Sequence, residues 1–275
     1  MTRYIAAYDT ESPKCLNAVR TIVDVHKRHQ MSATFFIVAR TLEANVDEYR
    51  ELLDDPLFEI ASHSYSHKLL RDHPLCGDAA SSPEIEEEIV RSKEYLETVF
   101  EREVPGFRTP VGFVDGLSGA SDVLKLVDGA GYRYVSSMAW GKDYSLPAPL
   151  TQPRTHAEDG FPDLWELPTH GWHENLLKDN NKWGASRLTL WPPYMPEAIP
   201  NDFVSTPEDE FAVHRVFLDR AKKDELAFVS LIWHPWSLGD FDPEMLMIDM
   251  VFSHVADIGL KKTTYAELLT HMVAG

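Results

Sequence analysis

Residues 4–38, YIAAYDTESPKCLNAVRTIVDVHKRHQMSATFFIV, decide the fold class because they predict a strand, a helix and a second strand in succession. Tyr4–Tyr8 form a short apolar run that is typical of a buried strand. Ser12-Pro13 then indicates a helix start, with a capping serine followed by proline at the first helical position. An amphipathic helix follows, indicated by the helical spacing of Leu16, Val19, Ile22, Val23 and His26. Ala33–Val38, β-branched and aromatic, predict the second strand.

The same alternation continues to the end of the chain. We expect further helices at residues 42–54, 83–102, 119–129, 208–222 and 243–258 and from Thr264 onward, and strands at 58–62, 133–137 and 227–233. Repeated strand–helix units imply a parallel sheet covered by helices. Because no glycine-rich nucleotide loop is present, the pattern favours a (β/α) barrel, in which chemistry lies where the strands end.

One region departs from this alternation. Residues 139–206 are irregular and rich in proline and tryptophan, with one strand expected at residues 164–168. We therefore expect a single domain over residues 1–275 with a Trp-rich insertion at about 139–206.

Composition excludes several classes of function. The 275 residues carry a net charge of −18 and a pI near 5.0, which argues against nucleic acid or an anionic membrane as the main partner. Two cysteines, Cys15 and Cys76, exclude a disulfide framework. Neither a Sec-type leader nor an apolar run of about 18 residues is visible, so we expect a cytoplasmic protein without a membrane span. A secreted protein whose leader has been removed is the competing interpretation.

The sharpest local signal is His63-Ser64-Tyr65-Ser66-His67, directly after a predicted strand. If this segment forms a helical turn, the four-residue spacing places both imidazoles on one face. Two neutral imidazoles and one carboxylate make a metal site with open positions, as in catalytic zinc sites. A pair of solvated surface histidines is the alternative.

Other reactive residue types follow separate segments of the pattern. Asp9 and Glu11 come at the end of the first strand, where Asp9 is a strand-end carboxylate before it is a helix-dipole residue. Arg108 follows the break at Pro105 and is either a surface cation or a bidentate partner for a carboxylate. His234 ends the strand at 227–233 and is either a core histidine or a general acid. The proline after His234 predicts an extended exit from that strand.

The order of these motifs resembles the NodB-type polysaccharide deacetylases, which are similar to carbohydrate esterase family 4. The resemblance rests on Ser32–Phe36, on Phe58–His67, on Glu86–Ile89 with Gly106–Pro110, and on Ile232–His234. It extends to an atypical branch that includes peptidoglycan-deacetylase-like and allantoinase-like hydrolases. The resemblance implies a distorted (β/α) barrel of about seven parallel strands, with a long irregular insertion.

The resemblance also implies roles for individual residues. His63 and His67 would bind a divalent metal, with zinc expected, Asp9 would act as the general base, and Arg108 would orient it. His234 would protonate the leaving amine. The family has two adjacent aspartates where this chain has Asp9-Thr10-Glu11. Either Glu11 takes the metal-binding role, or Asp9 binds the metal and another residue is the base.

The resemblance implies hydrolysis of a non-peptide C–N bond, with deacetylation of an N-acetylated sugar or polysaccharide favoured. An allantoinase-like hydrolase of a small cyclic ureide or imide is the alternative, and a non-catalytic carbohydrate-binding barrel is a third. Many such enzymes are homo-oligomers, which is an option here.

The aromatic residues of the insertion bear on the substrate, because aromatic faces stack on sugars. We expect substrate contacts from Trp140, Trp172, Pro110 and Trp236, against the alternative that each tryptophan, like Trp165, Trp183 and Trp191, packs the insertion on the barrel. Glu166 and Asp240 are candidates to tune His234, and His170 and His173 either reach the site or lie at the surface.

Overall fold

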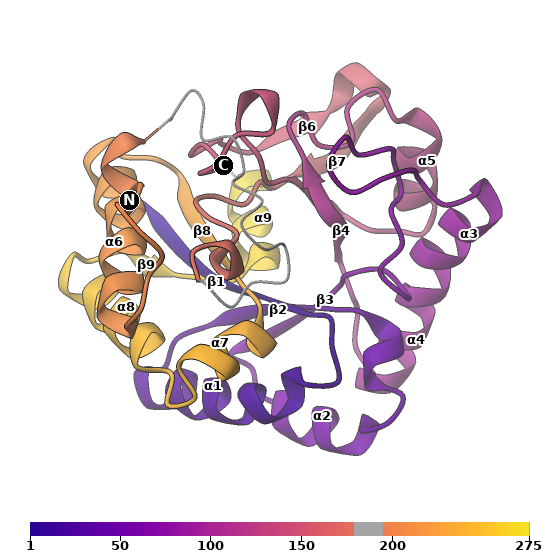
Figure 1. Cartoon of the computed structure of the whole chain (residues 1–275). Helices are drawn as coiled ribbons and strands as arrows, with labels where there is room; N and C mark the ends of the chain where they lie inside the picture. Colours follow the sequence, from indigo (N-terminus) through magenta and orange to yellow (C-terminus); the bar gives the residue numbers. More distant parts are fainter. Residues whose placement is uncertain (179–194, 275) are drawn as a thin grey trace.

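The computed structural model describes residues 1–178 and 195–274, and its centre is a parallel sheet (Figure 1). Within these residues seven strands run parallel in the order β7-β5-β4-β3-β2-β1-β8. Their bounds are β1 Arg3–Thr10, β2 Ala33–Ile37, β3 Phe58–Ser62, β4 Gly106–Phe113, β5 Tyr134–Met138, β7 Phe161–Glu166 and β8 Phe228–Trp233. The short β6, Arg154–His156, pairs antiparallel with β7, and β9, Lys261–Lys262, pairs with β1.

The sheet closes into a barrel through a single point of contact. Its edge strands β7 and β8 do not pair along their length in the described residues; instead, His170, four residues beyond β7, bridges to β8. The His170 backbone N–H donates to the Ser230 carbonyl at 2.9 Å, and the Ser230 N–H donates to His170 Nδ1 at 3.0 Å. This weak closure makes the barrel distorted, and the predicted fold class is confirmed.

Helices surround the barrel, and the last one, α9 (Tyr265–Val273), packs against its inner residues (Figure 1). The outer helices are α1 Cys15–His29, α2 Val46–Leu53, α3 Ser82–Glu86, α4 Ser92–Phe100, α5 Ser121–Gly129, α6 Pro207–Lys223, α7 Pro235–Phe241 and α8 Leu246–Asp257. A π-helical turn, Glu87–Arg91, joins α3 to α4. The last helix, α9 Tyr265–Val273, packs Tyr265, Leu268 and Leu269 against the inner barrel residues, among them Ile5, Phe36 and Phe228. The molecule therefore has two cores, one under the outer helices and one inside the barrel.

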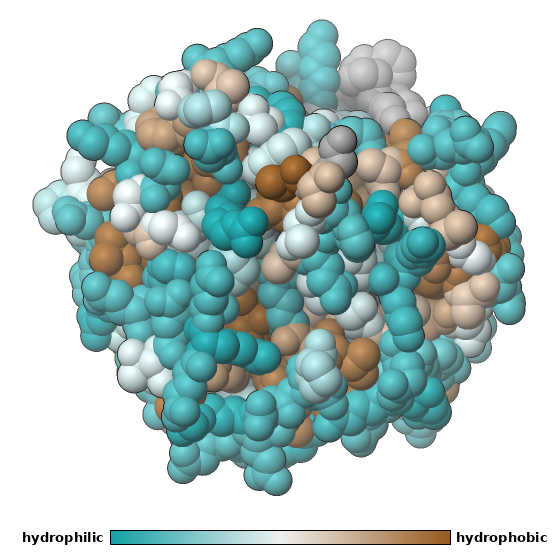
Figure 2. Space-filling model, turned by 180° about the vertical axis from the view of Figure 1, so that it is seen from behind, coloured by the Kyte–Doolittle hydropathy of each residue, from teal (hydrophilic) through white to brown (hydrophobic). Residues whose placement is uncertain are grey.

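The face of the molecule seen in Figure 2 carries mainly hydrophilic side chains, with apolar groups scattered among them. Among the described residues the large apolar side chains that stay exposed lie far apart in the sequence, for example Leu75, Phe203 and Leu246. None of the helices in residues 1–178 and 195–274 combines the length and apolar character that a membrane crossing needs.

Several helix boundaries differ from the sequence predictions. The first helix begins at Cys15, because Ser12-Pro13-Lys14 form a turn in which the Cys15 N–H donates to the Ser12 carbonyl at 2.9 Å. The expected helix at 42–54 is a 3₁₀ turn, Ala39–Leu42, followed by α2. The helix expected at 243–258 begins at Leu246. His234 itself is extended, as expected before a proline, but the chain continues as a helix and not as a loop, because Pro235 takes the first position of α7, where its fixed φ and missing N–H suit a helix.

The sequence pattern missed β4 and misjudged part of the insertion. Gly106, Pro110 and Gly112 suggest a loop, yet they lie on a central strand. At Gly106 a Cβ atom would lie 1.9 Å from the Tyr134 ring, so only glycine fits there. Within the predicted insertion 139–206, residues 161–166 form the barrel strand β7, which starts earlier than expected. Trp183 and Trp191 lie outside the described residues.

Candidate active site

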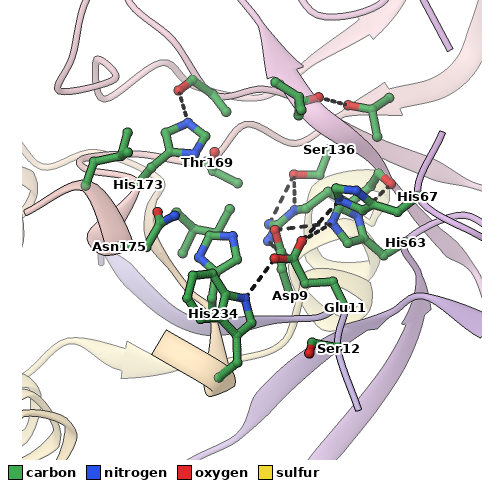
Figure 3. Close-up of a pocket in the computed structure, with 18 of the residues that line it drawn as sticks. Asp9, Glu11, Ser12, His63, His67, Ser136, Thr169, His173, Asn175 and His234 are labelled. Atoms are coloured by element: carbon green, nitrogen blue, oxygen red, sulfur yellow. Dashed lines mark hydrogen bonds and ion pairs between the residues drawn. The ribbon is translucent and has the colours of Figure 1, made fainter. Parts of the chain in front are cut away.

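A cavity of about 620 Å³ lies at the carboxyl ends of the barrel strands (Figure 3). The six residues expected to bind metal or take part in catalysis all line it: Asp9, Glu11, His63, His67, Arg108 and His234. They come from the end of β1, the loop after β3, β4 and the end of β8. Parallel strands present their carboxyl ends at one edge, and this explains how residues more than 200 positions apart meet.

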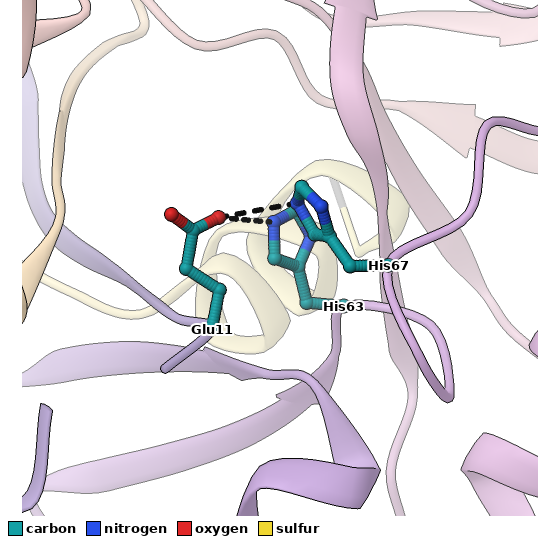
Figure 4. A group of neighbouring side chains, drawn as sticks. All are labelled: Glu11, His63 and His67. Atoms are coloured by element: carbon teal, nitrogen blue, oxygen red, sulfur yellow. Dashed lines mark ion pairs between the residues drawn. The ribbon is translucent and has the colours of Figure 1, made fainter. Parts of the chain in front are cut away.

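Glu11, His63 and His67 form a compact cluster of potential ligands (Figure 4). Their ligand atoms all lie within 4.8 Å of one another. Glu11 Oε2 is 3.1 Å from His67 Nε2 and 4.0 Å from His63 Nε2. Two imidazole nitrogens and a carboxylate oxygen are the donor set that catalytic zinc sites use.

The two histidines meet through a loop, and the expected helical turn is wrong. Residues 63–67 are not helical, and Ser64 and His67 have φ values of +67° and +66°. The His67 N–H donates to Ser64 Oγ at 3.0 Å, and the buried carboxylate of Glu88 accepts a hydrogen bond from the Ser66 N–H at 2.7 Å. With this loop conformation the imidazole centroids lie 4.9 Å apart.

The hydrogen bond at His63 Nδ1 fixes which nitrogen faces the cluster. His63 Nδ1 lies 3.1 Å from the carbonyl oxygen of Arg108, so Nδ1 carries the proton and donates it. The lone pair on Nε2 then points toward the carboxylates. Burial lowers the pKa of His63 to about 4, which leaves the ring neutral near pH 7, as a metal ligand must be.

Asp9 lies beside this cluster and is held by Arg108. Arg108 Nη1 donates to Asp9 Oδ1 at 2.7 Å, while Asp9 Oδ2 is 3.6 Å from His63 Nε2. Burial acts to raise the pKa of Asp9, but Arg108, His63 and His234 together outweigh it, so the net pKa is lowered. Asp9 is therefore an ionised carboxylate with one oxygen bound to Arg108 and the other facing the cluster.

His234 lies across the cavity and pairs with a carboxylate that the sequence analysis missed. Its Nδ1 is 2.9 Å from Glu174 Oε2, and its backbone N–H donates to Glu174 Oε1 at 3.2 Å. Although burial opposes the charged form, the carboxylates of Glu174 and Glu11 raise the pKa of His234 to about 9. Glu174 lies in the insertion, 60 residues before His234, and nothing in its sequence surroundings marks it as a partner.

Glu166 and Asp240, the candidates to tune His234, do not contact it in the described residues. Glu166 accepts hydrogen bonds from the Ser137 and Met138 backbone N–H groups at 2.8 and 3.1 Å, so it stabilises the end of β5. Asp240 lies on α7 without a recorded contact to His234 among the described residues. The expectation that Glu166 or Asp240 tunes His234 is wrong, because Glu174 occupies that place.

Glu174 is itself held by a buried cation. Lys178 Nζ is 3.7 Å from Glu174 Oε1 and 3.0 Å from Glu210 Oε1 on α6, and all three side chains are buried. Burial acts to raise the pKa of Glu174, but Lys178 and His234 lower it to about 2. Glu174 therefore stays ionised beside His234 throughout the neutral range.

The structure separates the residues expected to bind substrate into two groups. Trp140 and Trp236 line the cavity, and the Trp236 indole N–H donates to Glu11 Oε1 at 2.8 Å. Trp172 and Pro110 are buried and do not line it; the Trp172 indole N–H donates to the Ala198 carbonyl at 2.9 Å, so this ring packs the insertion.

The two histidines of the insertion also differ. His173 lines the cavity against the Trp140 ring, with centroids 4.7 Å apart, whereas His170 closes the barrel.

Comparisons with known proteins give a family match and several solved structures of similar fold. The family model for polysaccharide deacetylases matches residues 7–135, which include Asp9, Glu11, His63, His67 and Arg108. None of the curated proteins matches the chain. Solved structures that resemble it include a Mycobacterium smegmatis protein assigned to the polysaccharide deacetylases, with a TM-score of 0.67 and 19% identity over 99% of this chain and 91% of that one.

Two further structures of similar fold belong to proteins described as an allantoinase and as a pseudoenzyme. Puue allantoinase has a TM-score of 0.68 at 13% identity, over 99% of this chain and 90% of its own. A carbohydrate esterase family 4 pseudoenzyme from Bacillus anthracis has a TM-score of 0.55 at 16% identity, over 98% of this chain and 66% of its own. At these identities the likeness shows the fold. Residues 7–135 thus match the polysaccharide deacetylase family, and the likeness to solved structures shows that the chain as a whole has the corresponding fold.

Proposed function

We propose that the protein is a metal-dependent hydrolase that removes the acetyl group from an N-acetylated sugar or polysaccharide. One observation carries the proposal: the Glu11–His63–His67 cluster shares a cavity with the Asp9–Arg108 pair and the His234–Glu174 pair. The cavity thus combines a potential metal site, an ionised carboxylate and a protonated imidazole, which metal-assisted amide hydrolysis requires.

The donor set supports zinc as the metal. His63 Nε2, His67 Nε2 and Glu11 Oε2 would hold it, and the hydrogen bonds at His63 Nδ1 and Glu11 Oε1 orient two of these ligands. When bound, a divalent metal activates water as a nucleophile and polarises the amide carbonyl. In this assignment Glu11 takes the metal-binding role of the second family aspartate, and Asp9 remains the base.

Asp9 accepts the proton of the attacking water. Its Oδ2 atom faces the ligand cluster, and Arg108 holds Oδ1 so that the free oxygen keeps its direction. The low pKa of Asp9 keeps it ionised at neutral pH, ready to accept a proton.

His234 completes the reaction by donating a proton to the leaving nitrogen. Glu174 accepts a hydrogen bond from Nδ1, so the Nε2–H of the protonated ring is left for the substrate. As the C–N bond breaks, this proton converts the leaving group to a neutral amine, and acetate is the other product.

The shape of the cavity supports a second candidate, a small cyclic ureide or imide. Residues of the insertion, Thr169, His173, Asn175 and Leu176, form one wall of the cavity. A volume of about 620 Å³ bounded in this way suits a small molecule as well as one sugar unit. The allantoinase fold likeness points the same way. Trp236 instead favours the sugar, because its partly exposed ring lines the cavity and aromatic rings stack on sugars.

Product release tests these candidates directly. Zinc-loaded protein should release acetate from chitin oligomers, with acetylated xylan, allantoin and succinimide assayed in parallel and His63→Ala as the inactive control. Turnover of allantoin or succinimide alone would replace the sugar with a ureide or imide. A zinc-loaded protein without any turnover that still binds chitin oligomers would establish the non-catalytic barrel instead. We also propose a cytoplasmic location, and a homo-oligomeric state stays a prediction for light scattering to test.

A further inference from the structure

Tyr265, the first residue of the C-terminal helix α9, lies inside the barrel behind the candidate active site. Thr264 and Glu267 form a capping box that fixes the start of α9. The Tyr265 ring stacks on Tyr134, with centroids 5.6 Å apart and an interplanar angle of 14°, and meets Phe36 edge-on at 5.4 Å. The side chain is fully buried, so packing sets the position of its hydroxyl group closely.

That hydroxyl makes two hydrogen bonds, both with residues of the site or next to it. It accepts from Arg108 Nη2 at 3.0 Å and donates to the Pro168 carbonyl at 3.1 Å. Pro168 directly precedes Thr169, which lines the cavity. Burial raises the pKa of Tyr265, so the hydroxyl remains neutral and can donate. The Tyr265 hydroxyl thus connects Arg108, the partner of Asp9, to the segment after β7 that leads into the cavity wall at Thr169.

Arg108 needs such contacts to hold a single orientation. Its Nη1 donates to Asp9, its Nε and Nη2 approach Ser136 Oγ at 3.3 and 3.2 Å, and its guanidinium lies 3.7 Å from the centroid of the Phe36 ring. The two Ser136 contacts are long, so the Tyr265 hydroxyl is the closest polar partner of Nη2. Since a guanidinium donates in a planar fork, fixing Nη2 also fixes the direction of Nη1 toward Asp9.

We propose that Tyr265 is a positioning residue, which orients Arg108 from the C-terminal helix and, through Arg108, the carboxylate of Asp9. The catalytic consequence rests on the proposed function, in which Asp9 is the base. Filling the core does not require the hydroxyl, because a phenylalanine ring would occupy nearly the same volume, and burying a hydroxyl is unfavourable unless it is hydrogen-bonded. The hydrogen bonds with Arg108 and the Pro168 carbonyl explain why a hydroxyl group is present at this buried position.

Tyr265→Phe tests the inference, with Tyr134→Phe as the matched control. Tyr134 is equally buried and stacks on Tyr265 itself, but its hydroxyl donates to Glu59 at 2.7 Å and makes no hydrogen bond with Arg108. We expect Tyr265→Phe to lower kcat about tenfold, with KM and zinc content within about twofold of the original, because a hydrogen bond to a charged group is lost. Tyr134→Phe should keep kcat within about twofold, although both variants lose stability. Equal kcat in the two variants would overturn the inference.

Two further measurements show whether the effect passes through Arg108. In an Arg108→Lys background Tyr265→Phe should change kcat by less than about twofold, since the residue that it positions is already gone; a full tenfold further loss would argue against coupling. In a crystal structure of Tyr265→Phe, Arg108 Nη1 should no longer point at Asp9 Oδ1. An unchanged Arg108 would refute the inference, and this readout stands even if the protein releases no product and the proposed function fails.

Discussion

Replacing Glu174 with glutamine should move the alkaline limit of activity to lower pH. Glu174 is the carboxylate closest to His234, and its oxygens contact both Nδ1 and the backbone N–H of that residue. Glutamine keeps the size of the side chain and an oxygen that can accept one of these hydrogen bonds, but it removes the negative charge. The change therefore isolates the electrostatic contribution of Glu174 to the protonation of His234.

The size of the effect follows from the pKa of His234. Its pKa of about 9, against the ordinary 6.5, corresponds to about 3 kcal/mol at ~1.4 kcal/mol per pH unit. Burial opposes this rise, and Glu174, Glu11 and Asp9 produce it, with Glu174 contributing most. The share of Glu174 persists when Glu11 binds a divalent cation, because Glu174 contacts His234 directly and not through Glu11. We expect the pKa of His234 to fall by about one to two pH units in Glu174→Gln.

The direction of the change follows from the proposed role of His234 as general acid. A general acid must hold its proton, so activity survives until the pH rises through its pKa and is lost above it. The pH profile of kcat/KM for Glu174→Gln should therefore lose its alkaline limb one to two pH units earlier, with a smaller loss at pH 6 than at pH 8. Glu166→Gln is the control, since Glu166 is a buried carboxylate that contacts Ser137 instead. An alkaline limb that stays in place in Glu174→Gln would refute the assignment of His234 as the acid.

Three further predictions concern the metal ligands and the buried histidines. His63→Ala should abolish zinc retention, measured by metal analysis after dialysis, whereas His234→Ala should keep zinc and lose turnover; a His234→Ala protein at the original rate would exclude its catalytic role. Trp236→Phe should weaken zinc binding about tenfold in a chelator competition, because it removes the 2.8 Å hydrogen bond that orients Glu11. Burial lowers the pKa of His26 to about 3, so its stabilising contribution is complete above pH 6.5 and is lost as the pH falls toward 3. Between pH 6 and 4 the free energy of unfolding of the original protein should therefore fall about 1.4 kcal/mol more per pH unit than that of His26→Leu. The same pH dependence of unfolding in both proteins would contradict this.

The regular part of the fold could be predicted because its elements obey simple periodicity. The strand Phe58–Ser62 was expected at its observed bounds, and the helix expected at 208–222 differs from α6 by one residue at each end. β4 could not be predicted, because its glycines and proline are selected by close contact with neighbouring strands, as Gly106 is by the Tyr134 ring. Such contacts depend on which strands become neighbours, and local sequence does not contain that information.

The same distinction between local pattern and tertiary contact separates the site residues that could be predicted from those that could not. Asp9, His63 and His234 could be found because each lies at the end of a strand or directly after it, so the topology brings them together. Glu174 and Tyr265 could not, because Glu174 lies in an irregular segment and Tyr265 begins a helix that looks like any amphipathic C-terminal helix. Both act on the residues that the motifs mark, and their places are set by tertiary packing alone.

The spacing of Asp9, Thr10 and Glu11 has a geometric explanation in β1. Alternate residues of an extended segment point to the same side, so Asp9 in β1 and Glu11, directly after it, share a side, and Thr10 faces away. The structure agrees: Asp9 and Glu11 both line the cavity, whereas Thr10 is buried and absent from its wall. Glu11 Oε2 lies 4.0 Å from His63 Nε2 and 3.1 Å from His67 Nε2, so its side chain reaches both histidines. Thr10 is therefore compatible with a complete set of three ligands, and the departure from two adjacent aspartates does not by itself indicate an inactive protein.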